Sequence, residues 1–347
     1  MASQVTNEGQ AHEPVLLEEV LGWLRPEQGG VFVDCTLGLG GHSEAMLNAS
    51  PDTRVIGIDR DLQALALAKE RLSIFENRFQ AMHANFADLA EALDGARVTE
   101  VRGVLADLGV SSLQLDMGER GFSFASDAPL DMRMDQSGGD TAADLVNQLE
   151  EREMADLIFE YGEERGARKI ARAVVRERER NPITTTKQMA DIVVRALNIP
   201  GRWRIHPATR TFQALRIAVN RELDSLKDFI PQAISALASG GRLAIISFHS
   251  LEDRIVKHGF QRESGRCVCA SGTRSSRGEE LRRAMTRLEA VRQTGGDGND
   301  VDGVVCSNCG ARSRVRVLTR KPVRPTDDEA RRNPRSRSAL LRVCERL

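Results

Sequence analysis

The 347-residue chain has no long apolar run and no segment typical of an export signal. A helix that spans a bilayer needs about 20 mostly apolar residues, and no stretch approaches that length. The first residues, Met1 to Glu13, have neither the basic start nor the apolar centre of a secretory signal. We therefore expect a cytoplasmic protein without a membrane segment.

Cysteine is scarce and spread along the chain, at Cys35, Cys267, Cys269, Cys306, Cys309 and Cys344. Without an export signal, such cysteines are expected to be thiols or metal ligands rather than disulfides. The pair at 306 and 309 has a spacing common in zinc sites, whereas the pair at 267 and 269 is unusual. A four-thiolate zinc knuckle is thus one prediction, and four free thiols are the alternative.

The net charge of the chain is close to zero, since 49 basic and 50 acidic residues give −1. This argues against binding of a polyanion through the whole surface. The charge is unevenly distributed. From residue 312 to the end there are 12 basic and 4 acidic side chains. This basic tail predicts a local surface that faces phosphates, although a solvated tail without a partner would have the same composition.

A length of 347 residues favours about two domains. In the first third, short apolar runs alternate with helix-like segments, which is typical of βαβ units in a parallel sheet. Strands are expected at 31–34, 54–59, 78–82 and 101–107, with Asp61 as the cap of a helix after the second. A fifth strand is expected at 243–248, after a Gly240–Gly241 turn. The fold class is therefore α/β.

Between these strands lies a segment with helical periodicity and no strand pattern, for example Met189, Ile192, Val193 and Leu197. A long helix is then expected from about 208 to 229. Residues 263–303 are poor in apolar side chains and predict a mobile surface insertion. We therefore predict a sheet domain formed by 1–116 and 205–347, with an inserted helical domain at 117–204 for substrate recognition.

The most informative stretch is DCTLGLGGH at 34–42, in which a strand runs into a glycine-rich turn and a helix. Glycines allow a ligand to approach the backbone closely. Asp59 ends the next strand, 21 positions after Gly38, where a carboxylate accepts hydrogen bonds from ribose hydroxyls. Asp107 ends the fourth strand. Because ligands bind at the carboxyl ends of parallel strands, these residues are expected to converge on one pocket.

Two ligand classes fit such a pocket. A dinucleotide needs Gly-x-Gly-x-x-Gly for its pyrophosphate, and here Ser43 occupies the third glycine position. S-adenosylmethionine has no phosphate and carries positive charge, so Asp34 before the turn and Asp107 beyond it are favourable. We favour the methyl donor. His42 is interpreted as a helix cap or a backbone contact to the ligand, and Phe86 as an adenine-stacking or a core side chain.

With these residues in view, the chain resembles the bacterial 16S ribosomal RNA cytosine-N4 methyltransferases. The resemblance runs nearly end to end, through DLGVSSLQLD at 107–116, HPATRTFQALR at 206–216 and SFHSLEDR at 247–254. It implies a Rossmann-like class I methyltransferase with a helical insertion, S-adenosylmethionine as cofactor and 16S ribosomal RNA in the small subunit as partner. The donor-binding positions that it implies are Gly40, Gly41, His42, Asp59, Phe86, Asp107 and Gln114.

Because the cytosine amine is a poor nucleophile, catalysis must come from positioning and electrostatics. We expect Asp107 to accept its hydrogen bond, with Phe122, Phe124 or Phe248 stacked on the base and His249 as a candidate proton acceptor. Methylation at carbon 5 would need a cysteine nucleophile in a Pro-Cys or Thr-Cys pair, which is missing. A nicotinamide oxidoreductase and a non-catalytic assembly factor remain as alternative classes. Expected RNA contacts are Arg202, Trp203, Arg204, His206, Arg210 and Arg216, together with the tail at 331–342.

Overall fold

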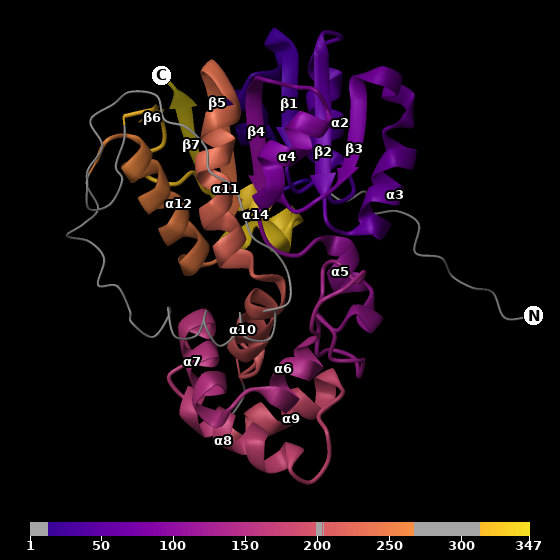
Figure 1. Ribbon diagram of the computed structural model, residues 1–347, viewed down its shortest axis with the longest axis vertical. Coiled ribbons are helices and arrows are strands. Elements are labelled where there is room, and N and C mark those ends of the chain that lie inside the picture. Colours follow the sequence, from indigo (N-terminus) through magenta and orange to yellow (C-terminus); the bar gives the residue numbers. More distant parts are fainter. Residues whose placement is uncertain (1–12, 199–202, 204, 267–312) are drawn as a thin grey trace, which may run out of the picture.

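The computed structural model describes residues 13–198, 203, 205–266 and 313–347 (Figure 1). In this part of the chain, a sheet covered by helices forms one end of the molecule, and a bundle of helices forms the other. Both cysteine pairs of the predicted zinc site lie outside the described residues. No helix in the described ranges is both long and apolar enough to cross a membrane.

The sheet has seven strands in the order β3-β2-β1-β4-β5-β7-β6. The first five are parallel, whereas β7 runs antiparallel to both of its neighbours. The strands are β1 (Gly30–Asp34), β2 (Thr53–Asp59), β3 (Phe79–His83), β4 (Val101–Asp107), β5 (Leu237–Ser247), β6 (Val315–Val317) and β7 (Leu340–Arg346). The five strands expected from the sequence are therefore present, and the α/β prediction is confirmed.

Two layers of helices cover the sheet because side chains along each strand point alternately to its two faces. In β4, Val104 and Ala106 pack into one apolar cluster, while Leu105 packs into another. The first cluster is shared with α4 (Leu89–Gly95), α11 (Glu222–Ala236) and α12 (Ser250–Glu263). The second is shared with α1 (Leu17–Leu24), α2 (Gly41–Ala49) and α3 (Leu62–Arg71). Asp61 caps α3 as expected, accepting hydrogen bonds from the backbone of Gln63 and Ala64.

The helical end of the molecule has an apolar core of its own, separate from those of the sheet. Its helices are α5 (Ser112–Asp116), α6 (Ala142–Gln148), α7 (Glu151–Gly162), α8 (Ala167–Arg178), α9 (Thr186–Leu197) and α10 (Thr209–Asn220). The stripe of Met189, Ile192 and Val193 is buried in this core. Phe212 of α10 is also buried in this core, so α10 packs with the helical end (Figure 1). The domain boundary at residue 204 stays a prediction.

The long helix expected over 208–229 is wrong, since two helices meet at Arg221, which has a left-handed backbone (φ 50°). The Asn220 side chain explains the break. Its amide nitrogen donates to the carbonyls of Met132 and Arg216, and its oxygen accepts from the backbone N–H of Met134. The chain thus exchanges helical hydrogen bonds for contacts with the loop before α6.

The Gly240–Gly241 turn is also wrong, because both glycines lie inside β5. The pairing with β4 shifts there from Val101–Leu237 to Gly103–Arg242, which is an irregular bulge. Gly240 adopts a positive φ of 76°, a conformation that glycine allows at little cost. Of the predicted insertion at 263–303, only 263–266 is described, and Glu263 there is the last residue of α12.

Helix α14 (Asp327–Arg332) contacts the segment just before α1. Buried Glu329 of α14 accepts a hydrogen bond from the backbone N–H of Leu16 (2.8 Å). A second link joins the two ends of the molecule: Glu163, at the end of α7, accepts hydrogen bonds from Ser250 (2.6 Å) and Arg254 (3.2 Å) of α12. The helical end is therefore attached to the sheet close to the carboxyl end of β5.

Candidate functional site

The glycine-rich turn connects β1 to α2, and its backbone is held by the neighbouring strand. The Gly38 N–H donates to Asp59 Oδ2 (2.7 Å) at the end of β2. Gly38 and Gly40 both have left-handed backbones (φ 52° and 80°). A Cβ on Gly40 would lie 2.9 Å from Leu72 Cδ1, and one on Gly41 would lie 2.6 Å from Pro14 Cγ. The turn therefore needs glycine for both conformation and space.

Asp34 lies below this turn and is almost fully buried (1% exposed). Its carboxylate accepts hydrogen bonds from Ser43 Oγ (2.8 Å) and from the backbone of Thr36 (3.3 Å). Burial raises the pKa of Asp34 to about 6, against the opposing effect of these hydrogen bonds. Asp34 is not among the residues that line the cavity described below. Its geometry is that of a support for the turn, and its predicted contact with the donor stays a prediction.

Asp59 and Asp61 organise the second side of the site. Asp59 Oδ1 accepts from the Asp61 N–H (2.9 Å), and burial raises the pKa of Asp59 to about 6. Asp61 Oδ2 in turn accepts from Gln114 Nε2 (2.9 Å). Gln114 also closes a capping box with Ser111 at the start of α5, so its side chain is fixed at both ends. The residues after β2 and after β4 are thus connected directly.

Asp107 lies at the end of β4, with its backbone N–H donated to Thr36 Oγ1 (2.6 Å). Its Oδ2 lies 3.9 Å from His42 Nδ1, and its buried Oδ1 has no hydrogen-bond partner among the described residues. Burial raises the pKa of Asp107 well above its ordinary value, and the charges of Asp34 and Glu252 raise it further. The site therefore holds one buried carboxylate oxygen whose hydrogen-bonding capacity no described residue uses.

His42 is fixed from the other side, since its Nε2 is 2.9 Å from the carbonyl oxygen of Val15. A carbonyl accepts only, so Nε2 carries the proton and Nδ1 faces Asp107 with a lone pair. Burial lowers the pKa of His42 to about 4, which keeps the ring neutral. Its geometry does not suit it to donate a proton to Asp107 at neutral pH.

A cavity of about 300 Å³ joins these groups at the carboxyl ends of the strands. Among its lining residues are seven of the nine predicted site residues: Gly38, Gly41, His42, Asp59, Phe86, Asp107 and Gln114. Gly40 and Asp34 are not among the lining residues. The Phe86 ring packs edge-on against Phe229 (5.3 Å), and the Arg60 guanidinium lies over the ring, 6.0 Å from its centroid. The volume and mixed polarity suit a small molecule.

The far wall of the cavity carries charges that the sequence did not place there. Arg216 of α10 forms a two-point ion pair with Glu222 of α11, with Nε and Nη2 each 2.8 Å from a carboxylate oxygen. Buried Glu252 accepts from the backbone of Phe248 (2.8 Å) and lies 3.1 Å from His249 Nε2. Arg216, Glu222 and Glu252 all line the cavity.

Sequence reasoning grouped Arg216 with the expected RNA contacts, and the structure places its side chain in the cavity wall, paired with Glu222. Its contact with RNA stays a prediction. The break at Arg221 causes the pairing with Glu222, since it brings residue 222 beside residue 216 across two helices. Glu252 had a detectable signal: it stands three positions after the helix cap His249, as in a capping box. Glu222 had none.

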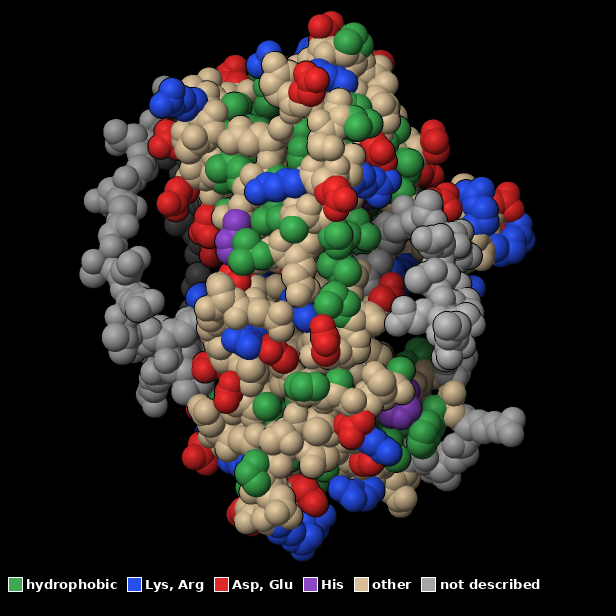
Figure 2. Space-filling view, turned by 90° about the vertical axis from the view of Figure 1, so that its right-hand side faces the viewer, with side chains coloured by type: hydrophobic (Ala, Val, Ile, Leu, Met, Phe, Trp, Pro, Cys, Tyr) green, Lys and Arg blue, Asp and Glu red, His purple; other side chains and the backbone are tan. Residues whose placement is uncertain are grey.

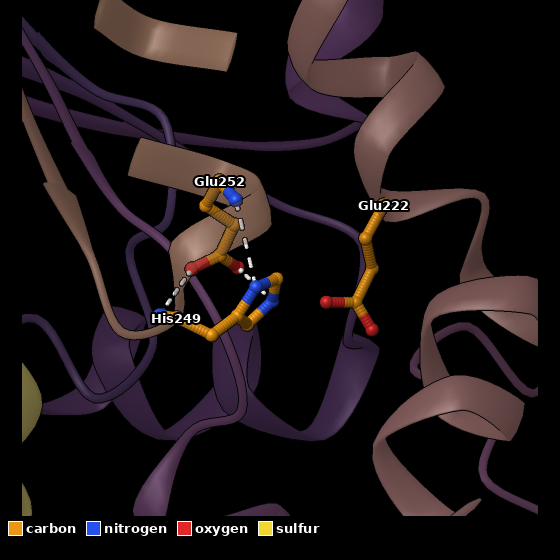
Figure 3. A group of neighbouring side chains, drawn as sticks. All are labelled: Glu222, His249 and Glu252. Atoms are coloured by element: carbon orange, nitrogen blue, oxygen red, sulfur yellow. Dashed lines mark hydrogen bonds and ion pairs between the residues drawn. The ribbon is translucent and has the colours of Figure 1, made fainter. Parts of the chain in front are cut away.

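Glu222, His249 and Glu252 are brought together as a group in which one ligand atom from each lies within 4.8 Å of the others (Figure 3). Such a set can hold a metal ion. Here, however, Glu222 is paired with Arg216, and Glu252 is occupied by two backbone N–H groups and by His249. Both carboxylates of the group thus have protein partners, while the buried His249 Nε2 forms no hydrogen bond with the described residues. We assign no metal to the group.

The three phenylalanines expected to stack on a target base are separated. Phe248 lines the cavity, whereas Phe122 is buried in the helical core. Phe124 packs on His206, with ring centroids 4.6 Å apart, outside the cavity. His249 contacts Glu252 and is likewise not a lining residue. Of the four side chains, only Phe248 can touch a base bound in the cavity.

The expected RNA contacts are also divided. Trp203 is 41% exposed and lies edge-on to His206, and Arg210 is an exposed side chain 3.8 Å from Glu164. Arg202 and Arg204 lie outside the described residues. In the described part of the side face drawn in Figure 2, acidic and basic side chains are interspersed, and no large field of one sign is present.

In the basic tail, Arg335 lines the cavity and pairs with Asp116 (2.9 Å), while Arg342 is buried beside Asp253. Arg342 is thus a structural side chain of β7 and is not available to phosphates. Arg331 and Arg332 are exposed. These exposed arginines therefore lie before β7, and their contact with phosphates stays a prediction.

The strand order, with β7 antiparallel at one side, and the glycine-rich turn after β1 with acidic strand ends define a Rossmann-like class I methyltransferase fold. The chain belongs to the MraW methylase family, which it matches over residues 9–294 and 297–347. The predicted fold class and family are thereby confirmed.

Several relatives, named ribosomal RNA small subunit methyltransferase H, are similar over nearly the whole chain. The protein from Geobacter sp. (strain M21) is 48% identical over 339 residues, covering 97% of this chain and 98% of its own. That from Geobacter sulfurreducens is 49% identical over 341 residues, covering 97% and 99%. That from Syntrophotalea carbinolica is 46% identical over 347 residues, covering 99% and 100%.

Proposed function

We propose that this protein transfers a methyl group from S-adenosylmethionine to the exocyclic N4 amine of a cytidine in the decoding region of 16S ribosomal RNA, within the small ribosomal subunit. The family membership and the printed name of the relatives support a methyltransferase that acts on small-subunit ribosomal RNA. The observation that carries the proposal is the unpaired, buried Oδ1 of Asp107, in the same cavity as the glycine-rich turn.

The residues present fit this donor. Gly38 and Gly41 bring the backbone to the cavity with no side chain in the way, and Asp59 at the end of β2 is placed to accept from ribose hydroxyls. Phe86 offers a ring face for adenine. Asp107 and, behind it, Asp34 put negative charge beside a cationic group. When bound, the donor supplies an electrophilic methyl group on a positively charged sulfur.

Asp107 has two tasks in this reaction. It accepts a hydrogen bond from the cytosine amine, which turns the nitrogen lone pair toward the methyl carbon. As the nitrogen–carbon bond forms and the carbon–sulfur bond breaks, the nitrogen becomes cationic, and Asp107 takes its proton. A carboxylate with a raised pKa is a stronger base than an ordinary one, and a neighbouring cation favours its charged form.

The other groups exclude water and hold the base. Phe248 follows β5 on the cavity wall and offers a stacking surface for a base turned out of its strand. Neutral His42, whose Nδ1 lies 3.9 Å from Asp107 Oδ2, supplies no proton to Asp107. Exposed arginines before β7, with Arg335 at the cavity, are placed to contact phosphates.

The test is transfer of a labelled methyl group to small subunits that lack the modification, followed by nuclease digestion and identification of the nucleoside. We expect N4-methylcytidine at a single position. Label on carbon 5 of cytosine, or no label on intact subunits and on naked RNA while the protein binds S-adenosylhomocysteine, would contradict the proposal. A stabilisation by NADH without one by S-adenosylhomocysteine would favour an oxidoreductase instead.

A further inference from the structure

The charged wall of the cavity, formed by Arg216, Glu222 and Glu252, contains hydrogen-bonding groups that have no role in the proposed reaction. Glu252 Oε2 accepts hydrogen bonds from the backbone N–H groups of Phe248 and His249, and its Oε1 lies 3.1 Å from His249 Nε2. Glu222 has both oxygens occupied by Arg216. Of the carboxylates that line this end of the cavity, Asp107 alone keeps a buried oxygen without a partner among the described residues.

Arg216 offers hydrogen-bond donors that no described residue uses. A guanidinium has five N–H groups in one plane. Two of them, one on Nε and one on Nη2, bind Glu222. The two-point pair fixes the plane of the guanidinium and leaves both N–H groups of Nη1 and one of Nη2 without a hydrogen bond to the described residues. The side chain is 17% exposed and borders the cavity.

The local charges keep these donors in place. Burial by itself disfavours a charged Arg216, but Glu222 and Glu252 outweigh that effect and raise its pKa above the ordinary value. Glu252 also acts electrostatically on Asp107. Asp107 and Arg216 both line the cavity, so the unpartnered acceptor and the free donors belong to one pocket.

An acceptor and a set of donors in one pocket match one class of base edge. Cytosine presents an amine donor, then the ring nitrogen N3 and the carbonyl O2 as acceptors. Uracil presents acceptor, donor, acceptor, so its ring N–H would face the guanidinium. Adenine has the amine and a ring nitrogen but no carbonyl beyond it. The wall thus complements the edge of cytosine when the amine is at Asp107.

On the basis of the proposed function, we propose that Arg216 is a specificity-determining residue, whose guanidinium, oriented by Glu222, binds the N3 and O2 acceptors of the target cytosine while Asp107 holds its amine. Glu222 is then a positioning residue. The pair selects the base by its hydrogen-bonding pattern, and it orients the ring so that the amine faces the methyl donor. A base without an acceptor at position 3 leaves a buried guanidinium N–H unpaired.

The experiment measures the affinity of the protein, saturated with S-adenosylhomocysteine, for cytidine and for the analogue in which N3 is replaced by carbon. The analogue keeps the amine and the carbonyl. For the unaltered protein we expect the analogue to bind at least about 10-fold more weakly, because one hydrogen bond to a charged donor is lost. Uridine is expected to bind more weakly still.

The matched variant is the double substitution Arg216→Met and Glu222→Gln, which removes both charges of the ion pair. It should bind cytidine more weakly and no longer distinguish cytidine from the analogue. Glu222→Gln alone should reduce the discrimination in part, because the guanidinium loses one anchoring oxygen. Binding of S-adenosylhomocysteine and the melting temperature report that each variant is folded.

Three outcomes overturn the proposal: an unchanged preference for cytidine in the double variant, an equal loss of affinity for both nucleosides, or no discrimination by the unaltered protein. The last includes a protein that binds neither nucleoside. Failure of the proposed function is a separate observation, since it appears as absence of methyl transfer to small subunits by the unaltered protein. If the unaltered protein transfers methyl groups and the double variant still prefers cytidine over the analogue, only the proposed role of Arg216 is contradicted.

Discussion

Arg120 and Asp61 form a buried ion pair between the helical end and the sheet, with Nη1 2.9 Å from Oδ2 and both side chains at most 3% exposed. The same guanidinium donates to the carbonyls of Arg133 and Met134. Asp61 Oδ2 also holds Gln114 at the cavity. The pair therefore connects the entry to the helical end with the start of α3 and with a lining residue of the site.

Loss of Arg120 should be costly, because Asp61 would remain as a buried carboxylate without its cation. We expect Arg120→Met to lower the free energy of unfolding by about 3–5 kcal/mol. Arg331→Met is the matched control: this exposed arginine pairs with Asp328 at the surface and should cost less than about 1 kcal/mol. Urea denaturation measures both, and equal effects would show that the buried pair has no special weight.

Gly40 should not tolerate a side chain. Its φ of 80° is left-handed, and an added Cβ would lie 2.9 Å from Leu72. We expect Gly40→Ala to destabilise the protein by about 1–2 kcal/mol and to weaken binding of S-adenosylhomocysteine, because the turn must shift. Gly138→Ala, where a Cβ meets nothing within 4 Å, should change neither quantity. Unaltered ligand binding by Gly40→Ala in calorimetry would separate the turn from the donor site.

Asp107→Asn should abolish most methyl transfer, since the amide keeps the shape of the carboxylate but cannot take a proton. We expect kcat on small subunits to fall roughly 10²- to 10⁴-fold. The exposed Asp94→Asn, on α4, serves as the control for a general change in charge. A decrease in kcat of less than about 3-fold for Asp107→Asn would exclude Asp107 as the proton acceptor.

The raised pKa of Asp34 predicts a specific pH dependence of stability. Burial moves this pKa from 3.8 to about 6, so the folded protein keeps a proton that the unfolded chain releases between about pH 4 and pH 6. Through this titration the free energy of unfolding decreases as the pH rises through that window. Two pKa units correspond to about 3 kcal/mol.

Asp34→Asn removes this titration. Relative to the unaltered protein, the variant should therefore gain up to about 3 kcal/mol of stability between pH 4 and pH 6, apart from a constant offset for the altered contact with Ser43. Denaturation curves at several pH values give the difference directly, and the exposed Asp127→Asn serves as the control. A difference that does not vary with pH would show that Asp34 is charged throughout this range in the folded protein.

Much of the fold followed from local patterns in the sequence. Apolar runs ending in Asp34, Asp59 and Asp107 predict parallel strands, and parallel strands align their carboxyl ends, so these residues had to lie near one another. The glycines after Asp34 predict a tight turn for the same local reason. The irregular segments escaped prediction because their causes are distant: Asn220 ends a helix by binding a loop almost 90 positions earlier, and the bulge at Gly240 depends on pairing with β4.

The sequence by itself therefore determined the sheet, the glycine-rich turn and the acidic strand ends beside it, because periodicity and strand polarity act over short distances. Only the tertiary structure decided the charged wall of the cavity. There, Arg216 of α10 lines the cavity, and the helix break at Arg221 brings Glu222 of α11 beside it. A charged side chain on an amphipathic helix has the same local pattern whether it faces solvent or a partner, and only packing distinguishes the two.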